Sequence, residues 1–141
     1  MTAINAERGE VGLALDARVF PMLPTFAAAN AIESQLGAVS NIVARLTVQR
    51  DIPKFGELAI IATECIKAAG KDRNDEMLVR VNAETIGEKI YEEGINDVLL
   101  KSFVVLLSNM VSGGTNSRAR KKAEAAALAA AQQQTGSPTA D

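Results

Sequence analysis

The sequence contains no histidine, no tryptophan and only one cysteine among its 141 residues. The chain therefore lacks histidine, the commonest metal ligand and a frequent general base in proteins. The single thiol, Cys65, excludes an intramolecular disulfide and is typical of a reducing compartment. Aromatic residues make up only 4% of the chain, although 48% of it is hydrophobic. A core built mainly from Ala, Val, Ile and Leu favours packed helices over a β-sandwich.

Charge of neither sign dominates. Fifteen basic and seventeen acidic residues leave a net charge of −2, which argues against a nucleic-acid-binding protein. No acidic cluster has the spacing of a metal-binding loop, and no glycine-rich segment has the pattern of a P-loop. Cys65 lies on an apolar helical face, so we interpret it as core filler rather than as a nucleophile. We expect no enzymatic activity, no cofactor and no metal site.

Long hydrophobic runs are also missing. The longest apolar stretch, residues 98–111, is interrupted by Lys101 and Asn109 and is too short and polar to cross a bilayer. Residues 1–10 have no apolar segment of the kind found in signal peptides. We therefore expect a soluble cytoplasmic protein with no membrane partner.

What is present indicates one mainly α (α+β) domain: an N-terminal β-hairpin packed on a bundle of about five helices. Residues 1–8 form a polar lead, residues 9–113 the domain, and residues 114–141 a flexible Ala/Gln-rich tail. The tail holds four basic and two acidic residues, so the rest of the chain carries 11 − 15 = −4. The tail has high helix propensity but little to bury.

The hairpin and the first helix form the opening of the domain. Residues 9–15 alternate in polarity, with Val11, Leu13 and Leu15 on one face, and predict a strand that turns at 16–18 and pairs with 19–23. Thr25 is placed to cap a helix that Gly37 ends. The apolar stripe predicted for this helix consists of Phe26, Ala29, Ile32 and Leu36.

Four further segments have helical or mixed patterns. Residues 39–48 predict an amphipathic helix, and residues 54–69 a helix that follows Pro53, is ended by Gly70 and is apolar nearly all round. This second helix is the predicted centre of the fold. Residues 77–81 fit either an extended segment or the lead into a helix. Residues 83–93 predict a helix capped by Asn82 and stopped by Gly94.

The last predicted helix follows Asn96. Its apolar face consists of Leu99, Phe103, Leu106, Leu107 and Met110. This helix and the helix at 54–69 carry more apolar surface than a small bundle comfortably buries. Two interpretations remain open: the excess forms a groove or subunit interface, or both helices pack at the centre of the bundle.

The basic run in the tail is the only candidate contact for a polyanion. It has no interleaved aromatic residues, so it is a weak nucleic-acid signal. It fits a solubilising tail, or a segment that folds against an acidic or helical partner. The run consists of Arg118, Arg120, Lys121 and Lys122.

Several of these features, in this order, resemble the tail proteins of gene transfer agents and related siphophages. The opening motif matches at Phe26, Glu33, Leu36 and Gly37. Further similarity lies in the Pro53 helix that runs to Ala-Ala-Gly at 68–70 and in the Ala-Glu-Thr-Ile-Gly sequence at 83–87. The resemblance extends over residues 7–113. This family is described both as a tail tube protein and as a tail assembly chaperone.

The resemblance implies a small, mainly helical chaperone that binds the tape measure protein and helps tail tube protein to assemble around it. It implies no catalytic residues, and a location in the bacterial cytoplasm during assembly rather than in the mature particle. A tape measure is a long helical chain whose apolar stripes need cover, which helix-in-groove binding supplies. We expect such a groove on the exposed faces of Phe103, Leu107 and Met110. Contact between copies, giving a homo-oligomer, is the other use of such a face.

Two other functions compete with this interpretation. A structural tail component, a tube or connector subunit, fits the second description of the family, but tube subunits are usually rich in β-structure and only one hairpin is visible. A small DNA-binding regulator requires a basic recognition helix. The acidic domain argues against that regulator.

Overall fold

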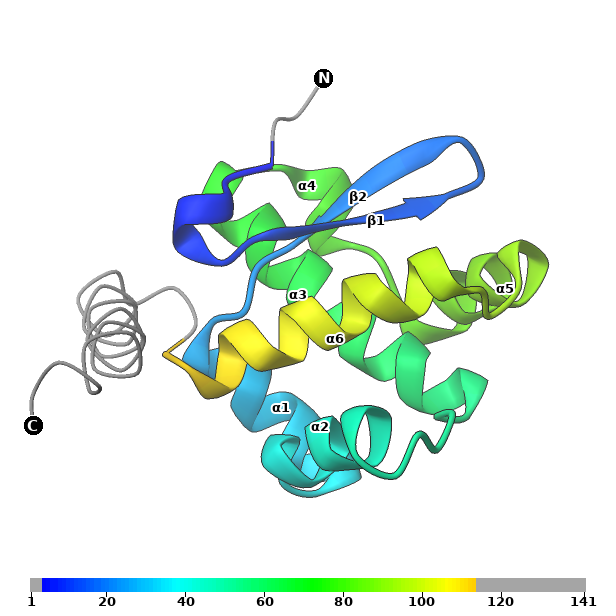
Figure 1. Cartoon of the computed structure of the whole chain (residues 1–141). Coiled ribbons are helices and arrows are strands. Elements are labelled where there is room, and N and C mark those ends of the chain that lie inside the picture. Colours follow the sequence, from blue (N-terminus) through cyan, green and yellow to red (C-terminus); the bar gives the residue numbers. More distant parts are fainter. Residues whose placement is uncertain (1–3, 114–141) are drawn as a thin grey trace, which may run out of the picture.

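The computed structural model describes residues 4–113, which form a two-stranded hairpin and six α-helices (Figure 1). This architecture confirms the predicted mainly helical domain with an N-terminal hairpin. In Figure 1, α6 crosses in front of α3, with the hairpin on one side and α1 and α2 on the other. The elements are a 3₁₀ turn η1 (Ala6–Arg8), β1 (Val11–Leu15), β2 (Arg18–Met22), α1 (Phe26–Leu36), α2 (Val39–Thr47), α3 (Phe55–Arg73), α4 (Glu76–Val79), α5 (Ala83–Glu93) and α6 (Asp97–Val111).

The hairpin follows the predicted alternation. β1 and β2 are antiparallel, with Leu13 opposite Phe20, and the inward side chains of Leu13 and Leu15 are fully buried. Asp16 and Ala17 both have positive φ, as a tight two-residue hairpin turn requires. The predicted start of β1 at residue 9 is wrong, because Gly9 takes a left-handed conformation that closes η1.

Helix α1 begins as predicted but presents a different face to the core. The Thr25 hydroxyl accepts a hydrogen bond from the Ala28 N–H at 3.0 Å, which confirms the cap. Ala28 and Ile32 are buried, whereas Phe26 is 85% exposed. Residues two apart on a helix lie about 200° apart around its axis, so Phe26 points away when Ala28 points inward. The predicted place of Phe26 on the buried stripe is therefore wrong.

Helix α3 is the centre of the fold, as predicted. It contacts α1, α4, α5 and β2, and it buries Ile61, Ala62, Cys65 and Ile66 completely. The prediction that Gly70 ends this helix is wrong. α3 continues for another turn to Arg73, and Gly70 lies where α4 packs closely against it. A Cβ atom at position 70 would lie 2.8 Å from the Leu78 Cβ and the Val79 nitrogen.

The remaining helix boundaries follow from side-chain chemistry. Asn82 accepts from the Thr85 N–H at 2.8 Å at the start of α5, and Asn96 accepts from the Leu99 N–H at 2.9 Å at the start of α6. Gly94 ends α5 with positive φ, as predicted. The ambiguous segment at 77–81 forms most of the short helix α4. Its cap is Asp75, whose carboxylate accepts from the Met77 N–H.

Candidate functional site

The predicted groove on α6 does not exist as an open surface. Phe103 and Leu107 are fully buried, because α2 and β1 cover the inner face of α6. The expectation that both side chains are exposed is therefore wrong. Met110 is half-buried and lines a small cavity of about 170 Å³ together with Phe26 and Gly113.

Burial also decides between the two interpretations of the apolar excess. Most large apolar side chains of α3 and α6 pack at the centre of the bundle, including Leu58, Ile61 and Leu106. The exposed ones on α6 are valines on its outer side, at positions 98, 105 and 111. The predicted tail contacts at Arg118, Arg120, Lys121 and Lys122 lie outside the described residues, as does the whole tail from residue 114.

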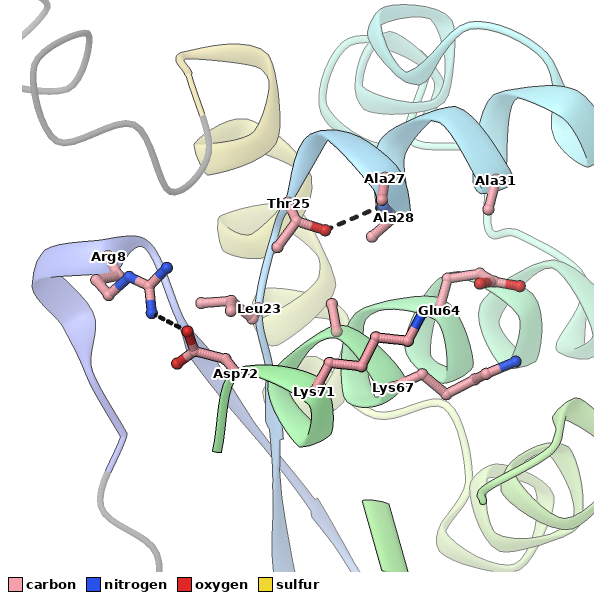
Figure 2. A pocket seen from close by; sticks show the side chains of 11 residues that line it. Arg8, Leu23, Thr25, Ala27, Ala28, Ala31, Glu64, Lys67, Lys71 and Asp72 are labelled. Carbon is pink, nitrogen blue, oxygen red and sulfur yellow. Dashed lines mark hydrogen bonds and ion pairs between the residues drawn. The ribbon is translucent and has the colours of Figure 1, made fainter. Parts of the chain in front are cut away.

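A larger open cavity, of about 520 Å³, lies between α1 and the C-terminal half of α3; we name it the α1–α3 groove (Figure 2). Its lining is small and apolar toward α1 and charged along α3. Figure 2 shows the alanines of α1 on one side and the long side chains of α3 on the other. The lining residues are Arg8, Leu23, Thr25, Ala27, Ala28, Ala31, Glu64, Lys67, Ala68, Lys71 and Asp72.

Local backbone contacts hold the two walls of the groove in place. The Leu23 N–H donates to the Cys65 carbonyl oxygen at 2.9 Å and fixes the segment before α1 against the middle of α3. Ala28 and Ile32 then pack α1 against the core. Because the side chains of Ala27 and Ala31 end at Cβ, the space beside them stays open. The groove is thus a consequence of small residues on a well-anchored helix.

Charges on the α3 wall are arranged unevenly. An ion pair of 2.6 Å joins the Arg8 guanidinium to the Asp72 carboxylate, so these two charges balance each other. Lys67 and Lys71 lie one turn apart and form no ion pair within residues 4–113, and neither does Glu64. Glu64, Lys67 and Lys71 together give 2 − 1 = +1 on this wall.

The single thiol of the chain lies outside the lining of the groove. Cys65 is completely buried, and burial raises the pKa of its thiol, which keeps it protonated and away from solvent. In the part of the chain that the structure describes, no group of three His, Cys, Asp or Glu side chains is placed to hold a metal ion. Over the same residues, no helix combines the length and apolar character needed to span a membrane.

Sequence reasoning missed the groove because the part of α1 that lines it contributes only alanines, which form no stripe of large apolar residues. The signal that was available is the run of small residues in α1, Phe-Ala-Ala-Ala-Asn-Ala at 26–31, next to a helix with lysines four residues apart. Comparisons of the chain with protein-family models, curated proteins and solved structures found no match.

Proposed function

We propose that this protein is a tail assembly chaperone of the phage or gene-transfer-agent type, which binds the tape measure protein and aids assembly of the tail tube. The observation that carries the proposal is the α1–α3 groove, an open cavity with an alanine-rich apolar wall. Its volume, about 520 Å³, lies within the range of roughly 300–1,000 Å³ that is typical of small-molecule pockets, and so leaves room for several side chains.

Helix-in-groove binding is the mode that suits this surface. Helices approach most closely where small side chains meet, at interaxial distances of about 8 Å. Ala27 and Ala31 lie one turn apart and so line the groove along the α1 axis. A partner helix there would insert its larger apolar side chains beside the alanines. Repeated along a tape measure, such contacts would cover its apolar stripes until the tube forms.

One observation favours the alternative, a tube or connector subunit. β1 and β2 pair only with each other among the described residues, so each strand keeps one edge without a strand partner. Such edges are able to add strands from neighbouring subunits, as tube rings require. This alternative also predicts contact with tail tube protein and between copies of the chain.

The test combines mass spectrometry of purified particles with recovery of the tape measure protein from infected lysate. The chaperone proposal expects the protein to retrieve the tape measure and to be absent from particles. An Ala27→Trp substitution fills the groove and should abolish retrieval, whereas Asn30→Trp, also exposed on α1 but outside the groove lining, should not. Stoichiometric recovery in particles would instead identify a structural component.

A further inference from the structure

We infer that the α1–α3 groove selects a helix whose apolar stripe is flanked on one side by carboxylates. This inference deepens the proposed function and rests on it, because it concerns the same groove. It specifies that one flank of the partner helix carries carboxylates and that this flank faces the α3 wall. The two lysines of the α3 wall carry the argument.

Lys67 and Lys71 are available to a partner. Their positions, one turn apart on α3, place both ammonium groups along the same wall of the groove (Figure 2). Neither forms an ion pair with any residue between 4 and 113. The other basic group in the lining, Arg8, is already paired with Asp72. The lining charges without an ion pair among the described residues are therefore Glu64, Lys67 and Lys71, and the two lysines make their sum +1.

The opposite wall carries no charge in the groove lining. α1 contributes three alanines and its N-cap Thr25 lies beside them, whereas the single charged residue of α1, Glu33, is not part of the lining. The Glu33 carboxylate instead accepts from the Val39 N–H at 2.9 Å, at the start of α2. A helix in the groove therefore meets a neutral wall on one side and, on the other, a wall where two lysines outnumber one unpaired glutamate.

This asymmetry determines how a partner helix fits. Carboxylates spaced by three or four residues along one flank would face Lys67 and Lys71 together. A partner with lysines on that flank would bring like charges together at the edge of an apolar site, where water is partly excluded. Glu64, one turn before Lys67, would disfavour a third carboxylate in line with the first two.

The experiment uses the full-length protein and two synthetic helical peptides of about 20 residues, about 30 Å long. Both carry the same Ala/Leu stripe, and they differ only in Glu or Lys on one flank. Fluorescence anisotropy should show roughly tenfold tighter binding of the Glu peptide, from two partly exposed ion pairs. The preference should shrink between about 0.05 M and 0.5 M salt.

Charge reversal provides the matched control. In a Lys67→Glu, Lys71→Glu variant the preference should invert, so that the Lys peptide binds more tightly. A Lys89→Glu, Lys101→Glu variant makes the same change in net charge outside the groove lining and should keep the original preference. Circular dichroism checks that both variants are folded.

The possible failures are distinguishable. Equal binding of both peptides by the unmodified protein, or an unchanged preference after charge reversal, would overturn the inference and leave the proposed function standing. If neither peptide binds, the helix-binding function and the inference both fail. If affinity for the Glu peptide weakens as protein concentration rises, a second copy of the chain occupies the groove, and a separate acidic partner is the wrong occupant.

Discussion

The inner face of α6 and the α1–α3 groove are both apolar surfaces beside a helix, but they are built from side chains of opposite size. α6 presents Leu99, Phe103 and Leu107, which α2 and β1 cover completely or nearly so. The groove presents alanines from α1 and Ala68 from α3, and a cavity of about 520 Å³ remains beside them.

The difference shows how residue size separates these two surfaces. A buried phenylalanine removes about 150–250 Å² from water, so burial of Phe103 strongly favours packing of the inner face of α6 within the chain. Ala27 and Ala31 in the groove lining add little area to the wall of α1, which leaves space beside them. At these two places, large side chains close the surface and small ones leave it open. Size alone does not decide burial elsewhere, since Phe26 is exposed and Ala62 is completely buried.

The largest expected effect concerns the buried inner face of α6. Phe103→Ala should lower the free energy of unfolding by about 3–5 kcal/mol, because it leaves a cavity at a fully buried site. Urea denaturation followed by circular dichroism measures this change. A loss below about 1 kcal/mol would mean that Phe103 is not a core residue.

Substitution of Gly70 tests the close packing of α3 against α4. Gly70→Ala should destabilise the protein by about 2 kcal/mol, because the new Cβ would lie 2.8 Å from the Val79 nitrogen. Gly56→Ala is the matched control on the same helix, where nothing lies within 4 Å of the added Cβ. It should stabilise by about 0.5–1 kcal/mol through helix propensity. Equal effects of the two substitutions in thermal denaturation would contradict this account.

The N-terminal end of α3 contrasts with the groove because its charges are paired. Hydrogen bonds from Arg45 and from the Lys54 N–H lower the pKa of Glu57 below its ordinary value of 4.5. The unfolded chain then takes up a proton at higher pH than the folded one. Stability from this site is therefore present above pH 4.5 and is lost as the pH falls through the lowered pKa.

Glu57→Gln removes this contribution. Its stability deficit relative to the unmodified protein should be full at neutral pH and should narrow in acid, as followed by denaturant titrations at several pH values. Two pH profiles that run parallel would show that the Arg45–Glu57 contact does not couple to folding. Lys67→Gln offers a comparison, since Lys67 has no ion-pair partner within residues 4–113 and its profile should show no such narrowing.

The smallest expected effect concerns the lysines of the groove. Lys67→Glu with Lys71→Glu should change the free energy of unfolding by no more than about 0.5 kcal/mol, because neither side chain holds the fold together. Urea denaturation alongside Phe103→Ala gives a direct contrast. A loss comparable to that of Phe103→Ala would show that these lysines are structural, which would weaken their assignment to binding.

The sequence was sufficient for elements whose boundaries depend on local chemistry. Thr25, Asn82 and Asn96 each cap the helix predicted for them, because a side-chain oxygen reaches N–H groups only two or three residues away. The alternation of Leu13 and Leu15 likewise identified the buried face of the hairpin. These features need no knowledge of distant residues.

Features that depend on distant residues were not predictable in the same way. The sequence predicts a helix end at Gly70. In the structure, the missing side chain at this position instead allows Leu78 and Val79 of α4 to pack closely against α3. Phe26 looks like a core residue, but the packing of Ala28 against α3 turns it outward. The groove escaped prediction because it is an empty space between two helices, which no periodicity in one helix reveals.

Site-specific photo-crosslinking tests the central claim, that the α1–α3 groove binds the tape measure protein, most directly. A photoreactive amino acid replaces Ala27 in one variant and Val105, exposed on the outer side of α6, in another. Each variant is irradiated in infected cells, and the product is identified by mass spectrometry. The account predicts a crosslink to the tape measure protein from position 27 and none from position 105. A crosslink from position 105 alone would contradict it.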